Sequence, residues 1–170
     1  MKRILFITCM LLTAMIVFSQ STFRNYSDLQ SFMSRRPTFE SVESGLKVTL
    51  NYSKSSGYYL EVGPNSKRIA IVDVSLNPSQ PNMAILGVEW LSEPAPLFID
   101  LRNSTPFLIL PAIPGEEAIS VDHNGRIQPG RTGRTNWMRL TMGGDGIQFT
   151  PYDSAQRPEP EYFKFIEYKK

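Results

Sequence analysis

Residues 46–62 read LKVTLNYSKSSGYYLEV, and this stretch decides the fold class. Side chains at positions 46, 48, 50 and 52 are aliphatic or aromatic and alternate with polar ones, which is the two-residue period of a half-buried strand. Ser55, Ser56 and Gly57 then break the pattern, and a second alternation follows over 58–62. Two alternating runs separated by a short turn predict a β-hairpin.

Similar runs recur along the rest of the chain. Further strands are expected over 69–76, 83–91, 97–101, 107–110 and 162–168. The run at 107–110 is continuously apolar between two prolines, so we expect either a strand buried on both faces or a segment that crosses at a sheet corner. Two more hairpins are expected, one turning at Asn124-Gly125 and the other over 143–146, because glycine and asparagine tolerate the backbone of a tight turn.

Only one helix is expected, over about 27–35, with one apolar face whose side chains recur at helical spacing. Ser27 and Gln30 have the spacing of a capping box, and Pro37 stops the helix. One short N-terminal helix followed by many short strands predicts an all-β fold. We expect an antiparallel β-sandwich first, with a small β-barrel as the alternative.

The first nineteen residues have the pattern of a secretory signal peptide. Lys2 and Arg3 precede an apolar run over 4–18, and Val17 and Ser19 suit a cut ahead of Gln20. The apolar run is too short for a stable membrane span. We therefore expect removal of residues 1–19, no membrane span afterwards, and a single β-rich domain over 20–170 that is periplasmic, extracellular or at the cell surface.

Composition narrows the possible partners and chemistry. The chain has 18 basic and 16 acidic residues; the leader holds two basic residues and no acidic one, so the mature part has 18 − 2 = 16 of each and no net charge. Such a domain has no overall field for nucleic acid. The only cysteine, Cys9, lies in the leader, so no disulfide or thiol nucleophile is expected. With one histidine no metal site is expected, and without a cofactor-binding loop no cofactor is expected. Export without cysteine fits a bacterial protein.

No catalytic arrangement stands out in the sequence. His123, the only histidine, follows Asp122 in a turn, and neighbouring side chains in a turn diverge rather than form a triad. Glu116-Glu117 is the only adjacent acidic pair, and we interpret it as an exposed loop. A glycosidase needs two carboxyl groups facing each other across a cleft, which any two acids could supply, so a carboxylate-dependent glycoside hydrolase stays as an alternative.

The most suggestive segment is rich in arginine. Arg126, Arg131, Arg134 and Arg139 have no acidic residue between them, and Trp137 lies among them. Guanidinium groups beside glycines and hydroxyls suit bidentate binding of carboxylate, sulfate or phosphate. These five residues are the predicted binding surface.

We therefore expect a secreted, non-catalytic binding or cell-envelope structural protein that recognises a partner protein or an anionic glycan through this arginine–aromatic surface. Beside the hydrolase, the second alternative is a barrel-type carrier of a small apolar ligand. Architecture alone does not choose between them, because one fold serves many functions.

Overall fold

The computed structural model describes residues 22–91, 93–114, 120–121, 127–128, 137–152 and 156–169. Helix α2 (Tyr26–Ser34) comes first, and eight strands then close into an antiparallel barrel. These strands are β1 (Pro37–Ser41), β2 (Lys47–Ser53), β3 (Gly57–Val62), β4 (Lys67–Leu76), β5 (Met83–Val88), β6 (Ala95–Asp100), β7 (Phe107–Leu110) and β13 (Glu161–Tyr168). The predicted hairpin is confirmed as β2 and β3.

The barrel closes because β13 pairs with β7 on one side and with β1 on the other. The prediction of a sandwich is therefore wrong, and the barrel alternative is correct. Both folds show the same alternation of apolar and polar residues, so no local pattern separates them; the difference lies in whether the first and last strands pair. Register shifts at Thr38/Phe39 and at Ile71/Asp73 are irregularities of the kind that increases the twist of a closing sheet.

Side chains fill the interior of the barrel. Leucines on five different strands have none of their surface exposed, so no water-sized space adjoins them. They are Leu50, Leu60, Leu86, Leu97 and Leu108. The described part of the barrel is thus a packed core.

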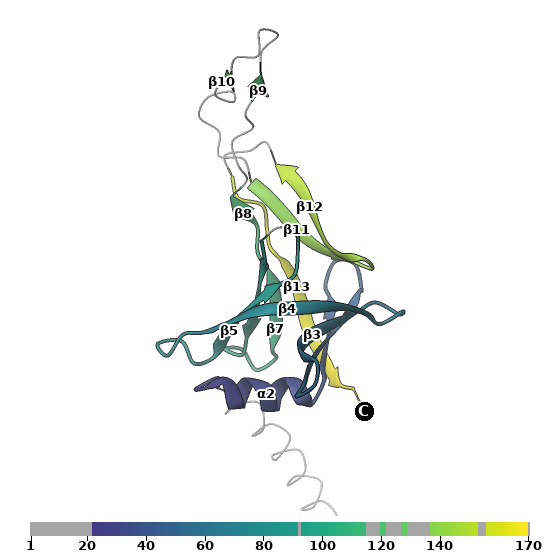
Figure 1. Ribbon diagram of the computed structural model, residues 1–170, viewed down its shortest axis with the longest axis vertical. Helices are drawn as coiled ribbons and strands as arrows, with labels where there is room; N and C mark the ends of the chain where they lie inside the picture. Colours follow the sequence, from purple (N-terminus) through teal and green to yellow (C-terminus); the bar gives the residue numbers. More distant parts are fainter. Residues whose placement is uncertain are drawn as a thin grey trace, which may run out of the picture.

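Helix α2 adds to this core from one side of the barrel (Figure 1). Leu29, Phe32 and Met33 stand at helical spacing on one face, and all three are buried in the same cluster as the strand leucines. The helix therefore covers the barrel with an apolar face, as its sequence predicted.

The helix starts two residues earlier than the capping box predicted. The side chain of Asn25 accepts a hydrogen bond from the Asp28 backbone N–H at 3.0 Å, so Asn25 is the N-cap in place of Ser27. At the other end Arg36 takes a φ of 55°, and Pro37 starts β1. The predicted stop at Pro37 is confirmed.

In the described parts of the chain, five short strands are inserted between β7 and β13. They are β8 (Ile113–Pro114), β9 (Ser120–Val121), β10 (Ile127–Gln128), β11 (Trp137–Gly143) and β12 (Gly146–Tyr152). Both further hairpins are confirmed as the pairs β9–β10 and β11–β12, the first with its turn outside the described residues. The β11–β12 hairpin lies on the side of the barrel opposite α2 (Figure 1).

One strand differs from its prediction in burial. In β7 only Leu108 and Leu110 are fully buried, while Phe107 and Ile109 face outward and are half-buried. A continuous apolar run therefore forms a one-sided strand here, because the outer face of the barrel is also partly apolar. No helix among the described residues is long and apolar enough to cross a membrane.

Candidate functional site

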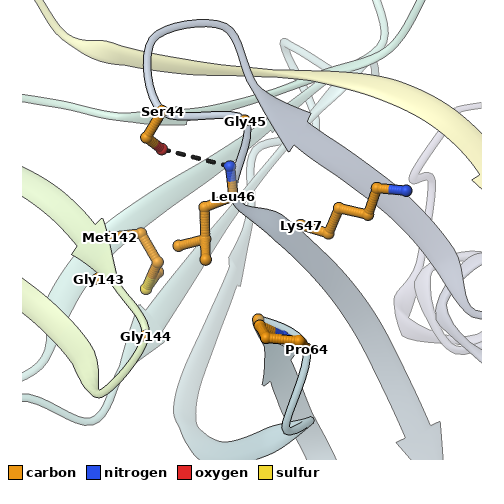
Figure 2. Close-up of a pocket in the computed structure, with 9 residues that line it drawn as sticks. Ser44, Gly45, Leu46, Lys47, Pro64, Met142, Gly143 and Gly144 are labelled. Atoms are coloured by element: carbon orange, nitrogen blue, oxygen red, sulfur yellow. Dashed lines mark hydrogen bonds between the residues drawn. The ribbon is translucent and has the colours of Figure 1, made fainter.

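A cleft of about 520 Å³ opens where the β11–β12 hairpin meets the barrel. Three turns line it, and Figure 2 shows the Leu46 side chain between Met142 and Pro64, with the Lys47 side chain pointing away from them. The lining residues are Ser44, Gly45, Leu46, Lys47, Gly63, Pro64, Met142, Gly143 and Gly144. This volume is in the range of small-ligand sites, and the side chains that enter it are largely apolar.

Glycines let the three turns approach one another. Gly63 has a φ of +68°, and a Cβ placed there would lie 3.5 Å from Leu46 Cδ1 and 4.0 Å from the Cα of Gly144. Gly45 also has a positive φ, +70°, a backbone conformation that residues with a side chain rarely adopt. Gly144 differs, because a Cβ there meets no heavy atom within 4 Å. A side chain can therefore be added at this position of the lining without a clash at its Cβ.

A buried carboxylate holds the strands around the cleft together. Glu161, the first residue of β13, is only 2 % exposed. Its Oε1 accepts a hydrogen bond from Ser41 Oγ at 2.6 Å, and its Oε2 accepts one from the Met142 backbone N–H at 2.7 Å. Glu161 thus joins β1, β11 and β13. Its carboxyl group accepts the Met142 N–H in place of a carbonyl oxygen from a neighbouring strand.

The surroundings of Glu161 favour its neutral form. Burial raises the pKa of the Glu161 carboxyl, and the hydrogen bonds from Ser41 and Met142 only partly offset this effect. Glu43 raises the pKa further, and Arg139 lowers it. A raised carboxyl pKa is a property of general acids, but this side chain is buried and both its oxygens are bonded within the protein. In this arrangement it fastens strands together.

Two ion pairs at the surface also link the β11–β12 hairpin to the barrel. Arg139 on β11 pairs with Glu43 in the turn after β1 and also donates to the carbonyl oxygen of Glu159 at 3.2 Å. At the tip of the hairpin, Lys67 Nζ donates to the carbonyl oxygen of Asp145 at 2.9 Å and lies 3.5 Å from its Oδ1. Exposed pairs of this kind contribute little stability each, so the hydrogen bonds of the buried Glu161 and the apolar contacts dominate the docking.

The structure describes only part of the predicted binding surface. Arg126, Arg131 and Arg134 lie outside the described residues. Trp137 and Arg139 both lie on β11, two residues apart and therefore on one face of the strand. Because the Arg139 guanidinium is bound to Glu43 and Glu159, its place in an anion site would require these contacts to break.

Trp137 has a partner that the sequence reading missed. The guanidinium carbon of Arg157 lies 5.3 Å from the Trp137 ring centroid, and Arg157 Nη2 donates to the Ala112 carbonyl at 3.0 Å. The indole Nε1 of Trp137 is buried and has no hydrogen-bond acceptor in the part of the chain that the structure describes. A basic and aromatic contact does form at Trp137, but its arginine lies beyond the predicted segment.

The other residues considered as catalytic candidates lie in segments that the structure does not describe. His123, Asp122, Glu116 and Glu117 lie outside the described residues. Within the described ranges, no three histidine, cysteine or acidic side chains gather where they could hold a metal ion.

The cleft residues share no sequence motif, because they come from turns far apart in the chain. One signal could have pointed to Glu161. Period-two alternation in the last strand puts residue 161 on the same face as Phe163 and Phe165, so an acid stands on an apolar face. A charged residue in such a position is seldom buried without a specific partner.

Comparison with protein families, with curated proteins and with solved structures found no match.

Proposed function

We propose that this protein is exported and acts as a non-catalytic binding protein that holds a partner protein in the cleft between the β11–β12 hairpin and the barrel. The observation that carries this proposal is an apolar cleft of about 520 Å³ at the joint of two substructures, outside a filled barrel. Apolar side chains of a partner are the usual anchors for such a recess.

The lining favours a partner protein over an anionic glycan at this position. Leu46, Met142 and Pro64 supply apolar surface, and the one cation of the lining, Lys47, points away from them (Figure 2). An anionic glycan would instead need the arginine cluster predicted at Arg126, Arg131 and Arg134. The two partners therefore use different residues and can be separated by substitution.

The packing also weighs against the two other functions. A carrier of an apolar ligand needs interior space, whereas the leucines of the barrel are fully packed. A glycoside hydrolase needs two accessible carboxyl groups, and Glu161 does not supply one of them in this arrangement, because it is 2 % exposed and bonded at both oxygens.

The test compares a large and a small side chain at one open position of the cleft lining. Gly144→Phe adds a ring at the open position of the lining, and Gly144→Ala is its matched control because a Cβ fits there freely. Labelled protein is measured for saturable retention on isolated native envelopes and on an anionic glycan array. We expect Gly144→Phe to weaken envelope retention at least about tenfold, and Gly144→Ala to leave it within about twofold.

A second arm tests the arginines. If Arg131→Ala/Arg134→Ala abolishes retention while Gly144→Phe does not, the partner site is the arginine cluster and the cleft is excluded. If the unaltered protein is retained on neither surface, the binding function itself is wrong.

A further inference from the structure

Strand β12 forms the outer edge of the sheet β12-β11-β8 (Figure 1). Residues 146–152 read GIQFTPY and carry no charge, and positions 148 to 152 are all exposed. Exposed edges normally carry lysine, proline or a bulge that discourages pairing with another chain. Here only Pro151 has that effect, and it lies near one end of the strand.

The hairpin register fixes which backbone groups are free. Gly143 pairs with Gly146 across a two-residue turn, so these two exchange hydrogen bonds, and the bonds then recur at every second pair. The N–H and C=O groups of Ile147 and Phe149 consequently point away from β11. The same alternation turns the Met142 N–H away from β12 and toward Glu161, as observed. Among the described residues, nothing accepts from the Ile147 or Phe149 N–H.

Apolar side chains lie beside these free groups. Phe149 is 47 % exposed although its ring meets Trp90 edge-on, with centroids 5.8 Å apart. Leu91, next to Trp90, is 77 % exposed, and Tyr152 on β12 is 38 % exposed. An edge with unpaired backbone groups and exposed apolar neighbours is suited to an added strand.

We propose that β12 pairs antiparallel with β12 of a second copy of this chain, about a two-fold axis at Gln148. In this register Ile147 stands opposite Phe149 of the second copy, and each N–H meets a C=O, which gives four hydrogen bonds. Pro151 falls beyond the paired residues. With the axis at Phe149, Pro151 would oppose Ile147 and leave its carbonyl without a donor, so that register is disfavoured.

The strand is its own complement, and this selects a second copy as the occupant. The absence of charge removes repulsion between like strands, and the Ile147–Phe149 pairs join a β-branched with an aromatic side chain across the new ladder. The two three-stranded sheets then join into one six-stranded sheet, in which neither copy of β12 is an edge.

The register predicts a specific cross-link. Gln148 of the two copies forms a pair without mutual hydrogen bonds, in which Cα atoms lie about 4.5 Å apart, within the range of a disulfide. Thr150 of the two copies would be about 14 Å apart along the strands. In a Cys9→Ser background, Gln148→Cys should therefore form a disulfide-linked dimer under mild oxidation at least about tenfold faster than its matched control Thr150→Cys. Equal rates, or faster linking through residue 150, would overturn the proposed pairing.

A second measurement keeps the proposal testable if a cysteine variant fails to fold. Phe149→Pro removes one outward N–H and leaves the β11–β12 bonds intact, whereas Phe149→Ala removes the ring and keeps the N–H. Sedimentation of the Cys9→Ser chain over a range of concentrations should show a dimer, whose dissociation constant rises roughly thirtyfold in Phe149→Pro and less in Phe149→Ala. A monomer at every concentration overturns the proposal, and so does equal weakening by the two variants.

Discussion

Glu161 and Glu61 are both buried carboxyl groups, and their surroundings shift their pKa values in opposite directions. Burial raises the pKa of Glu161 above its ordinary 4.5. Burial also opposes ionisation of Glu61, but hydrogen bonds and charge from Lys169 and Arg36 outweigh it and lower the pKa. The two residues therefore contribute to the free energy of unfolding in different pH windows.

For Glu161, the folded state holds its proton more tightly than the unfolded chain. Its contribution to stability is fully present below pH 4.5 and is lost as the pH rises through the raised pKa. Gln can replace it, accepting from Met142 N–H and donating to Ser41 Oγ. We expect Glu161→Gln to remove this pH-dependent loss, measured by urea unfolding from pH 4 to 8. An identical pH profile in the two proteins would contradict this, and the exposed Glu167→Gln is the control.

Glu61 shows the opposite sign. Its Oε2 accepts from Arg36 at 3.0 Å and from Lys169 at 3.2 Å, so its contribution is present above pH 4.5 and is lost as the pH falls through the lowered pKa. Since both cations are partly exposed, we expect Glu61→Gln to cost about 1 kcal/mol at pH 7. The difference from the unaltered protein should vanish in strong acid; a constant difference at all pH values would exclude this origin.

At the scale of elements, the docking of the β11–β12 hairpin depends on apolar contact more than on its exposed ion pairs. Leu140 on β11 has no exposed surface, whereas the Asp145 side chain at the hairpin tip is 95 % exposed. We expect Leu140→Ala to lower the free energy of unfolding by about 2–4 kcal/mol, and Asp145→Ala by less than about 0.5 kcal/mol. Denaturant titration of both variants tests this, and a reversed order would place the docking energy in the Lys67–Asp145 pair.

The elements themselves could largely be predicted from the sequence, whereas their association could not. Alternation over 46–62 predicted β2 and β3 correctly, and the apolar face of α2 was predicted from its spacing. The pairing of β13 with β1 joins residues more than a hundred positions apart, and no short pattern encodes it. The cleft was missed for the same reason, because its turns meet only after the barrel closes.

At the scale of the whole molecule, one strand holds the barrel shut. β13 lies between β7 and β1, and without it both neighbours would become edges of an open sheet around an apolar interior. Pairing Pro37 with Tyr168 also requires almost the entire described chain to be in place. Closure therefore depends on contacts between residues far apart in the chain, and we expect the stability of the barrel to depend on β13.

This dependence can be measured by removing and restoring β13. A chain that ends at Glu159 lacks Phe163, a fully buried core residue, and loses the pairings of β13 with β1 and with β7. We expect it to lose cooperative thermal unfolding, because the sheet cannot close and the core is exposed to water.

A synthetic peptide of residues 160–170 should restore the transition by pairing with β1 and β7 in place of the missing strand, whereas the same peptide with Phe163→Asp should not. As a control, deletion of residues 169–170 removes the Lys169 contacts but neither strand pairing of β13, and it should keep the transition with a loss of about 1–2 kcal/mol. Cooperative unfolding of the chain that ends at Glu159, without added peptide, would show that the barrel is stable without its closing strand.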